Sequence, residues 1–254
     1  MGADRPVLLL GGTGEARDLA ARLVAADIPV VSSLAGRVAQ PRLPVGEVRI
    51  GGFGGVDGLQ TWLREHDATA IVDATHPFAA TITEHAAVAA HATDIPLLRL
   101  ARPPWIAGPD DQWLTVPDMA AAAREVGRRG GRVFLTTGRQ DVGVFAGIDS
   151  AWFLIRVVDP PTADLPTHHQ LLRSRGPYDL DSERTLLSDN QIDVLVSKNS
   201  GGELTRAKLV AAAELGVDVI MVQRPAEPGV GTTVHTVDDA EDWVLSQPTC
   251  RRGV

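Results

Sequence analysis

The chain of 254 residues is 44% hydrophobic and carries a formal charge of −8, so it can fill one large globular core or two smaller ones. The negative charge argues against nonspecific binding of nucleic acid. No apolar run is long enough to span a bilayer, and no leader segment is recognisable before the first predicted strand, so we expect a cytoplasmic protein with no membrane contact. Its single cysteine, Cys250, excludes a disulfide or a thiolate metal site within one chain.

Apolar segments of strand length alternate with segments of helical spacing along the whole chain. Strands are predicted at 7–10, 28–31, 70–72, 96–100, 133–135, 153–158, 194–196 and 219–222. They are continuously rich in Val, Ile and Leu, which is typical of strands covered on both faces. Helices are predicted at 15–26, 58–66, 79–92, 118–129, 179–190, 205–215 and 238–245. The alternation predicts an α/β fold with parallel sheets.

The alternation breaks at RLARPPWIAGPDDQW (99–113), where prolines and aspartates interrupt it. We therefore expect two α/β domains, residues 1–103 and 104–254, each with its own sheet. The active site is expected in the crevice between them, because the carboxyl ends of parallel strands provide ligand sites. The proline-rich segment 159–178 is predicted as a long loop at that crevice.

The first predicted strand leads into the turn GGTGEAR and then into a helix, which is the context required for phosphate binding. The fingerprint G-x-G-x-x-G is met by Gly12 and Gly14, but Arg17 stands in place of the third glycine. We expect Gly12, Thr13, Gly14 and Glu15 to bind a cofactor, with the Thr13 hydroxyl donating to a phosphate, and Arg17 to contact the substrate. A tight turn that needs glycine only for its backbone angles is the structural alternative.

The end of the second strand distinguishes the two nicotinamide cofactors. NAD sites place an acidic residue there to bind the ribose 2′-OH, whereas NADP sites use small donors and an arginine. Here Ser32, Ser33 and Arg37 follow Val30 and Val31, with no carboxylate to repel a 2′-phosphate. The pattern favours NADP. The alternative for Arg37 is a solvated loop arginine without a role in binding.

Two further turns follow predicted strands. In DATHPFA, we expect Thr75 to cap the next helix and contact the cofactor, and His76 to lie at the sheet edge as a candidate catalytic residue. In TTGR, Thr137, Gly138 and Arg139 present hydroxyls, an open backbone and a cation, and are expected to bind the cofactor. For DATHPFA, the alternative is a capping motif in which the histidine has no functional role. For TTGR, it is an ordinary strand-to-helix turn.

The segment SKNSGG is the densest polar cluster and stands just before a predicted helix. Lys198, one of only two lysines, is the first candidate for proton delivery or electrostatic catalysis, with a surface lysine as its alternative. The residues expected to bind substrate here are Ser197, Asn199, Ser200, Gly201 and Gly202. The adjacent pair His168 and His169 has no evident third ligand, so no metal is assigned.

The ordered set LLLGGTGEARDLA, IVDATHPFA, TTGRQ and SKNSGG resembles the precorrin-6A reductase family of cobalamin (vitamin B12) biosynthesis, over nearly the whole chain. The resemblance implies an oxidoreductase acting on a CH–CH group, which uses NADPH to reduce a carbon–carbon double bond of the precorrin-6A macrocycle to precorrin-6B. It also implies two Rossmann-like domains, an N-terminal NADP-binding domain (1–103) and a C-terminal substrate-binding domain (104–254), in a monomer or a weak homo-oligomer. Arginines and Lys198 can pair with the carboxylates of such an anionic tetrapyrrole.

Two other functions stay open from the residues alone. A redox sensor that binds NADP without catalysis explains the first turn but leaves TTGRQ and SKNSGG without a task. A tetrapyrrole enzyme that needs no nucleotide explains those segments but leaves Ser32, Ser33 and Arg37 unexplained.

Overall fold

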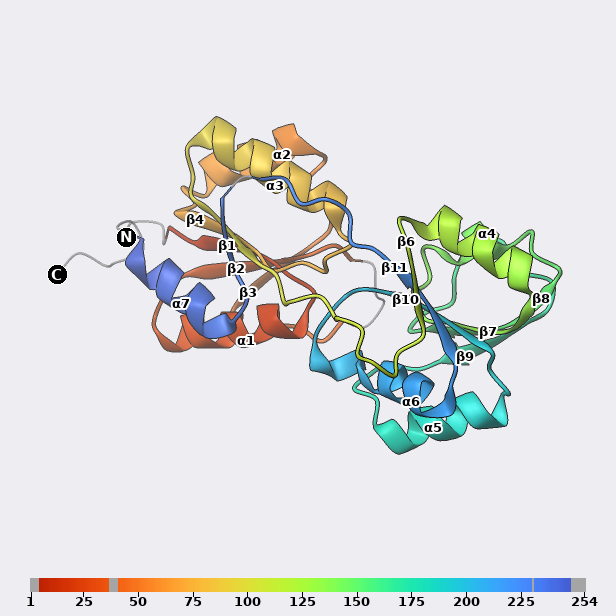
Figure 1. Cartoon of the computed structure of the whole chain (residues 1–254). Coiled ribbons are helices and arrows are strands. Elements are labelled where there is room, and N and C mark those ends of the chain that lie inside the picture. The colour runs from red at the N-terminus through yellow and green to blue at the C-terminus, as the bar shows by residue number, and fades with distance from the viewer. Residues whose placement is uncertain (1–4, 37–40, 230, 248–254) are drawn as a thin grey trace. The chain divides into compact units, whose positions relative to one another are not determined.

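The computed structural model describes residues 5–36, 41–229 and 231–247. The chain divides into two compact units (Figure 1). One unit runs to Arg102 and resumes at Pro225, and the other comprises Pro103–Arg224. Each unit has a six-stranded sheet in which every pairing is parallel. The predicted α/β class with two parallel sheets is confirmed.

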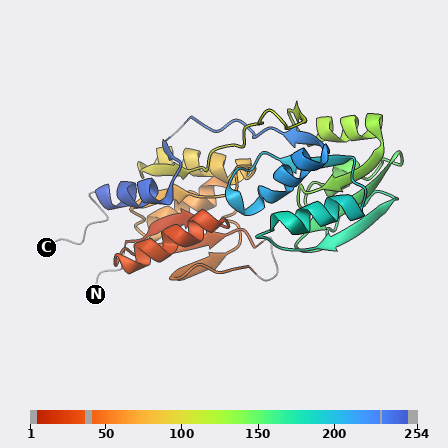
Figure 2. The ribbon, with the colours of Figure 1, turned by 60° about the horizontal axis from the view of Figure 1, so that its bottom comes forward.

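The sheet of the first unit has the strand order β12-β5-β4-β1-β2-β3. Its strands are β1 (Val7–Leu10), β2 (Val30–Leu34), β3 (Glu47–Ile50), β4 (Ala70–Asp73), β5 (Leu97–Leu100) and β12 (Thr232–Val234). Its helices are α1 (Gly14–Ala25), α2 (Val56–Glu65), α3 (Ala80–Thr93) and α7 (Val237–Ser246). Helices α1 and α7 cover one face of the sheet, and α2 and α3 cover the other (Figures 1 and 2).

Alternate residues of β1 fill the two cores of this unit. Val7 and Leu9 pack with Leu19 of α1 and Val244 of α7, whereas Leu8 and Leu10 belong to a second cluster with α2 and α3. All four β1 residues are buried. A strand buried on both faces must be apolar throughout, which explains its VLLL sequence.

The second unit has the strand order β6-β11-β10-β7-β8-β9. Its strands are β6 (Trp113–Val116), β7 (Gly131–Leu135), β8 (Ala151–Val157), β9 (His169–Arg173), β10 (Val194–Lys198) and β11 (Asp218–Val222). Its helices are α4 (Met119–Arg129), α5 (Leu180–Asp189) and α6 (Ala207–Leu215), with two short 3-10 helices, η1 (Val142–Phe145) and η2 (Glu203–Thr205). Figure 1 shows α4 on one face of this sheet and α5 with α6 on the other.

The return of the chain to the first unit corrects the expected domain 104–254. Strand β12 pairs with β5, with Thr232 opposite Leu98. Helix α7 buries Ala240 and Val244 in the core that β1 and α1 share. The C-terminal segment therefore supplies apolar surface to the first core, a tertiary contact that no local pattern in the sequence reveals.

Four strands, β3, β6, β9 and β12, are absent from the sequence prediction. Each lies at the edge of a sheet, and most of their residues are exposed or half-buried. Such strands have no continuous apolar run by which they could be predicted. Strand β9 also corrects the segment 159–178, which is not one long loop but contains a strand paired with β8.

In the described part of the chain, no helix combines the length and the apolar character that crossing a membrane requires.

The placement of α7 predicts that Val244→Ala destabilises the first unit selectively. Val244 is fully buried, and removing two methyl groups from a packed core costs about 2 kcal/mol. Hydrogen exchange should show lower protection of β1 and β4 amides and unchanged protection in β7 and β10. Val88→Ala, at a position 47% exposed on α3, is the matched control. Loss of protection confined to the second unit would contradict the assignment.

Candidate active site

The strand order of the first sheet changes direction between β1 and β4, and this switch point is where doubly wound sheets bind ligands. The turn after β1 brings Gly11 to Gly14 to that edge. Gly12 has φ +113°, and a Cβ placed on it would meet no atom within 4 Å. The backbone is therefore open to an approaching group in front of the amino end of α1, a helix of 12 residues, where anions are favoured.

Thr13 joins the turn after β1 to the turn after β4. Its hydroxyl donates to the Ala74 carbonyl at 2.7 Å and accepts from the Ala16 N–H at 3.1 Å, which makes it the N-cap of α1. The hydroxyl proton is thus committed to Ala74. In this structure the turn therefore presents its backbone, and a contact of the Thr13 hydroxyl with a phosphate stays a prediction.

The end of β2 carries the two serines in different environments. Ser32 is buried, and its hydroxyl has no hydrogen-bond partner in the described residues. Ser33 accepts a hydrogen bond of 2.7 Å from the guanidinium of Arg49, a residue of β3 that sequence reasoning missed because β3 itself was missed. Ser32, which faces the core, is therefore not an exposed cofactor contact. Arg37 lies outside the described residues.

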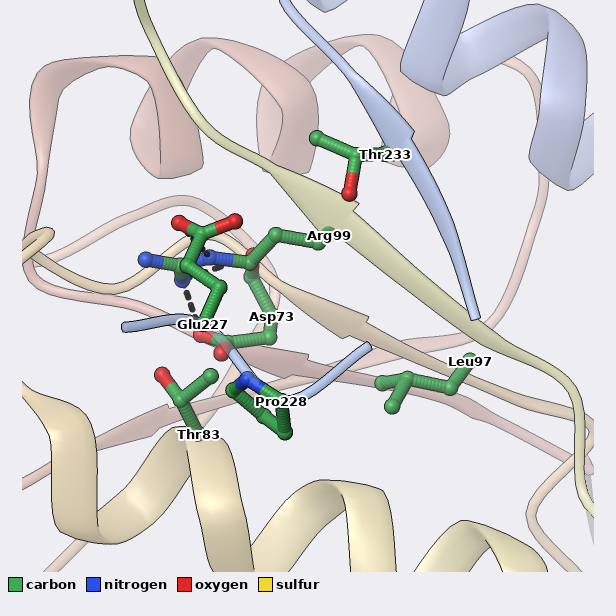
Figure 3. Close-up of a pocket in the computed structure, with 7 residues that line it drawn as sticks. All are labelled: Asp73, Thr83, Leu97, Arg99, Glu227, Pro228 and Thr233. Atoms are coloured by element: carbon green, nitrogen blue, oxygen red, sulfur yellow. Dashed lines mark hydrogen bonds and ion pairs between the residues drawn. The ribbon is translucent and has the colours of Figure 1, made fainter. Parts of the chain in front are cut away.

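A buried ion pair organises the turn after β4 (Figure 3). Arg99 Nη1 lies 2.8 Å from Asp73 Oδ1, and both side chains are almost fully buried. The same Asp73 oxygen accepts from the Thr75 N–H at 3.0 Å and the Thr75 hydroxyl at 2.7 Å. Arg99 also lies 3.4 Å from Glu227, in the segment leading to β12. Asp73, which is itself held by Arg99, thus fixes the position of Thr75.

Thr75 does not cap α3 as expected, and its contact with the cofactor stays a prediction. Helix α3 begins at Ala80, and its N-cap residue, Ala79, makes no side-chain capping bond. The Thr75 hydroxyl donates to Asp73 and accepts from Arg99 at 3.2 Å. Instead of a cap, a turn closed by the Ala79 N–H on the His76 carbonyl at 2.7 Å precedes the helix, and Pro77 occupies the position where its fixed φ favours such a turn.

His76 lies half-buried in this turn at the carboxyl edge of β4. Its Nδ1 accepts a hydrogen bond of 3.2 Å from the Phe78 N–H. An accepting Nδ1 places the proton of the neutral ring on Nε2. His76 is thereby held in one tautomer as a potential donor, as a proton-transfer role requires.

Glu15 and Arg17 begin α1 on the side of the glycine turn. Both carboxylate oxygens of Glu15 lie 3.3 Å from Arg102 Nη1. The negative charge of Glu15 is thus engaged by Arg102, and a contact of Glu15 with the cofactor stays a prediction. Arg17 is half-buried and makes no hydrogen bond or ion pair with any described residue.

In the second unit, the turn after β7 carries Thr136 to Arg139. The Thr136 hydroxyl donates to the Val196 carbonyl of β10 at 2.9 Å. Thr137 is buried, and its hydroxyl has no partner in the described residues. Gly138 is exposed with φ +82° and open space where a Cβ would stand. The structure thus groups Thr137, Gly138 and Arg139 with the SKNSGG segment, and their contact with cofactor stays a prediction.

Lys198 ends β10 and forms an ion pair of 2.5 Å with Asp141, which follows the β7 turn. The Lys198 side chain is 18% exposed, and the ion pair with Asp141 fixes the position of its ammonium. Ser197, one residue earlier, is fully buried, and its hydroxyl donates to the Lys198 carbonyl. Ser197 is therefore enclosed within the strand, and its contact with substrate stays a prediction.

The Asn199 side chain binds the protein's own backbone, and its contact with substrate stays a prediction. Its Oδ1 accepts from the Trp105 N–H at 2.8 Å, and its Nδ2 donates to the Trp105 carbonyl at 3.0 Å. A Cβ on Gly201, which has φ +66°, would lie 2.1 Å from the Pro103 carbonyl oxygen. The Trp105 indole donates to the Gly202 carbonyl at 3.0 Å. The glycines thus allow residues 103–105 to pack against the loop.

The 3-10 helix η2 follows these glycines, and α6 begins only at Ala207. The helix predicted at 205–215 is therefore present as α6, one short 3-10 helix after the glycines. Gly202 and the buried Ser200 still border the surface beside Lys198, and their contact with substrate stays a prediction.

Lys208, in the first turn of α6, is a buried amine that sequence reasoning passed over. Its Nζ donates to the Thr136 hydroxyl at 3.1 Å and lies 5.6 Å from the centre of the Trp105 ring. Burial, with the nearby charge of Arg156, lowers the pKa of Lys208 to about 7, against the opposing effect of Glu183. Arg156 itself forms a buried two-bond pair with Glu183, at 2.7 and 3.1 Å.

No group of three or more His, Cys, Asp or Glu side chains in the described ranges could hold a metal ion. His169 begins β9, and its Nδ1 bonds the Pro166 carbonyl at 2.7 Å.

The switch point, glycine turn and strand order of the first unit define a Rossmann-type fold. The sequence profile described as precorrin-6x reductase CbiJ/CobK matches residues 6–245. The chain belongs to this family.

Similar proteins extend the match over nearly the full length. The chain is 54% identical to a precorrin-6A reductase of Rhodococcus erythropolis, over 94% of this chain and 96% of that one. It is 53% identical to a precorrin-6A reductase of Mycobacterium tuberculosis, over 96% and 98%. A solved structure described as CobK precorrin-6A reductase shares 38% identity with a TM-score of 0.91, covering 98% and 100% of the two chains.

The environment of Lys208 predicts that Lys208→Met stabilises the protein in a pH-dependent way. The folded pKa of about 7 lies below the ordinary 10.5, so between these values the unfolded chain binds more protons and wild-type stability rises with pH. The burial penalty is complete below about pH 7 and is relieved by about 3 kcal/mol between pH 7 and 10. Urea unfolding should show the largest gain from Lys208→Met near neutral pH. A gain that does not vary with pH would contradict this prediction.

Proposed function

We propose that this chain is a precorrin-6A reductase of cobalamin biosynthesis, which transfers hydride from NADPH to a carbon–carbon double bond of precorrin-6A and yields precorrin-6B. The observation that carries this proposal is the open glycine turn at the switch point, within a chain 54% identical to an enzyme of that name. A relative named cobalt-precorrin-6A reductase, from Priestia megaterium, is only 30% identical. The comparison favours the cobalt-free macrocycle as substrate.

The first unit fits a nicotinamide dinucleotide. Gly12 leaves space for a pyrophosphate beside the N–H groups at the start of α1. The described residues at the end of β2, through Gly36, include no carboxylate that would repel a 2′-phosphate. This composition supports NADPH over NADH, and NADPH supplies the hydride when it is bound.

The second unit supplies the polar groups that an anionic macrocycle requires. Lys198 Nζ, fixed by Asp141 and 18% exposed, is proposed to deliver a proton to the substrate carbon next to the one that receives hydride. Gly202 and Ser200 are proposed to border the bound substrate beside it. His76 is the second candidate donor, through Nε2, because its Nδ1 is occupied by the Phe78 N–H.

One experiment separates this function from a sensor that binds NADP without catalysis and from a tetrapyrrole enzyme that needs no nucleotide. The purified protein is mixed with NADPH, with and without enzymatically prepared precorrin-6A, and the nicotinamide absorbance is followed. We expect oxidation of NADPH only when precorrin-6A is present. Binding without oxidation would indicate the sensor. Absence of NADPH binding would exclude both the sensor and the reductase.

The choice between the two proton donors predicts a larger effect at Lys198. Lys198→Met should lower kcat by about 100-fold or more, because loss of a general acid removes a factor of that order, while NADPH affinity stays unchanged. His76→Gln, the matched variant in the first unit, should lower kcat less than Lys198→Met does. Single-turnover kinetics at varied NADPH concentration give both the rate of reduction and the affinity for NADPH. The reverse order would assign the proton to His76, and unchanged rates in both variants would assign it to water.

The predicted cytoplasmic location and the monomeric or weakly associated state stay predictions of the sequence.

A further inference from the structure

We propose that Arg49, supported by Ser33, binds the 2′-phosphate of NADPH and sets the preference of this enzyme for NADPH over NADH. The inference rests on NADPH as the reductant proposed above. It replaces an expectation based on Arg37 with a residue whose contacts the structure describes.

The position of Arg49 follows from the sheet register. Arg49 is the partner of Ser33 in the β2–β3 pairing, and Ser33 is in turn the partner of Leu10 at the end of β1. Both residues therefore lie at the carboxyl edge, next to the strand that leads into the glycine turn. In dinucleotide-binding folds of this strand order, the end of the second strand holds the adenosine ribose, and a nearby arginine accommodates a 2′-phosphate.

The charge of Arg49 is uncompensated within the described part of the chain. Its guanidinium donates to the Ser33 hydroxyl at 2.7 Å and to the carbonyls of Gly51 and Gly52, each at 3.1 Å. All three acceptors are neutral, and none of the described ion pairs involves Arg49. Partial burial lowers the pKa of Arg49, which reflects a desolvated cation without a counter-ion. An anionic ligand would supply the missing charge.

The guanidinium is also held in place before any ligand arrives. Its Cζ lies 3.7 Å from the centre of the Phe53 ring, and Phe53 packs edge-on against Trp62 of α2, with ring centres 6.0 Å apart. An arginine fixed by stacking and by two carbonyls loses little conformational freedom when it binds a phosphate. The Ser33 hydroxyl, which accepts from Arg49, keeps its own proton as a second donor to the same group.

The proposed ligand group is a phosphate monoester on a ribose, and free inorganic phosphate could bind the same arginine. Three probes distinguish the nucleotide from free phosphate. Adenosine 2′,5′-bisphosphate carries the 2′-phosphate, adenosine 5′-monophosphate lacks it, and inorganic phosphate lacks the nucleoside. Selective binding of the bisphosphate supports the proposal, and equal binding of inorganic phosphate and the bisphosphate would overturn it.

The decisive experiment measures dissociation constants of NADPH and NADH by nicotinamide fluorescence, for the full chain and its variants. Arg49→Met should weaken NADPH by about 30-fold, as expected for loss of hydrogen bonds to a charged group, and NADH by less than about threefold. Arg49→Lys should recover part of the loss because it retains the charge. Arg64→Met removes an exposed arginine of the same unit, which bonds Gln60 on α2, and should change neither constant.

The outcomes separate this inference from the proposed function. Equal losses for NADPH and NADH in Arg49→Met, or no loss for either, would overturn the role of Arg49 and leave NADPH as the reductant. A specific loss of NADPH in Arg37→Met alone would transfer the role to Arg37. Failure of the wild-type chain to prefer NADPH would instead contradict the proposed cofactor. The near-ultraviolet circular dichroism of each variant checks that the Phe53 and Trp62 packing is intact.

Discussion

The first unit depends on the buried ion pair between Asp73 and Arg99. Two charges removed from water are costly unless hydrogen bonds satisfy them, and here the carboxylate also accepts from the amide and hydroxyl of Thr75. That arrangement fixes the backbone at Ala74, whose carbonyl receives the Thr13 hydroxyl. A chain of contacts thus runs from Arg99 of β5, through Asp73 of β4, to Thr13 after β1, and it holds the glycine turn in place.

Much of this architecture could be predicted because buried parallel strands are apolar on both faces. Every strand predicted from a continuous apolar run is present, with ends that differ by a few residues, and each predicted helix is found. The edge strands could not be found in this way, because residues such as Glu47 and Arg49 are exposed or half-buried and form no apolar run. The return of β12 and α7 to the first sheet was equally invisible, since pairing between distant segments is a property of the folded chain.

The candidate site could be located from the sequence, but the direction of its side chains could not. Glycine turns after strands marked both sheet edges correctly, and Lys198 does stand at the end of a strand. The hydroxyls of Thr13 and Thr75 and the amide of Asn199 nevertheless bind partners within their own unit. Conversely, Arg49 and Lys208 became visible only through their surroundings, because desolvation and missing counter-charge arise from tertiary packing.

The discontinuous first unit has a consequence for the order of folding during synthesis. Residues 103–224 form one uninterrupted stretch, so the second unit can complete its own sheet as soon as that stretch has left the ribosome. The first unit is begun earlier and finished later, because one layer of its core needs Ala240 and Val244. A chain truncated before β12 would therefore contain a complete second unit and an incomplete first unit. The edge of β5 would be unpaired and could pair with other chains.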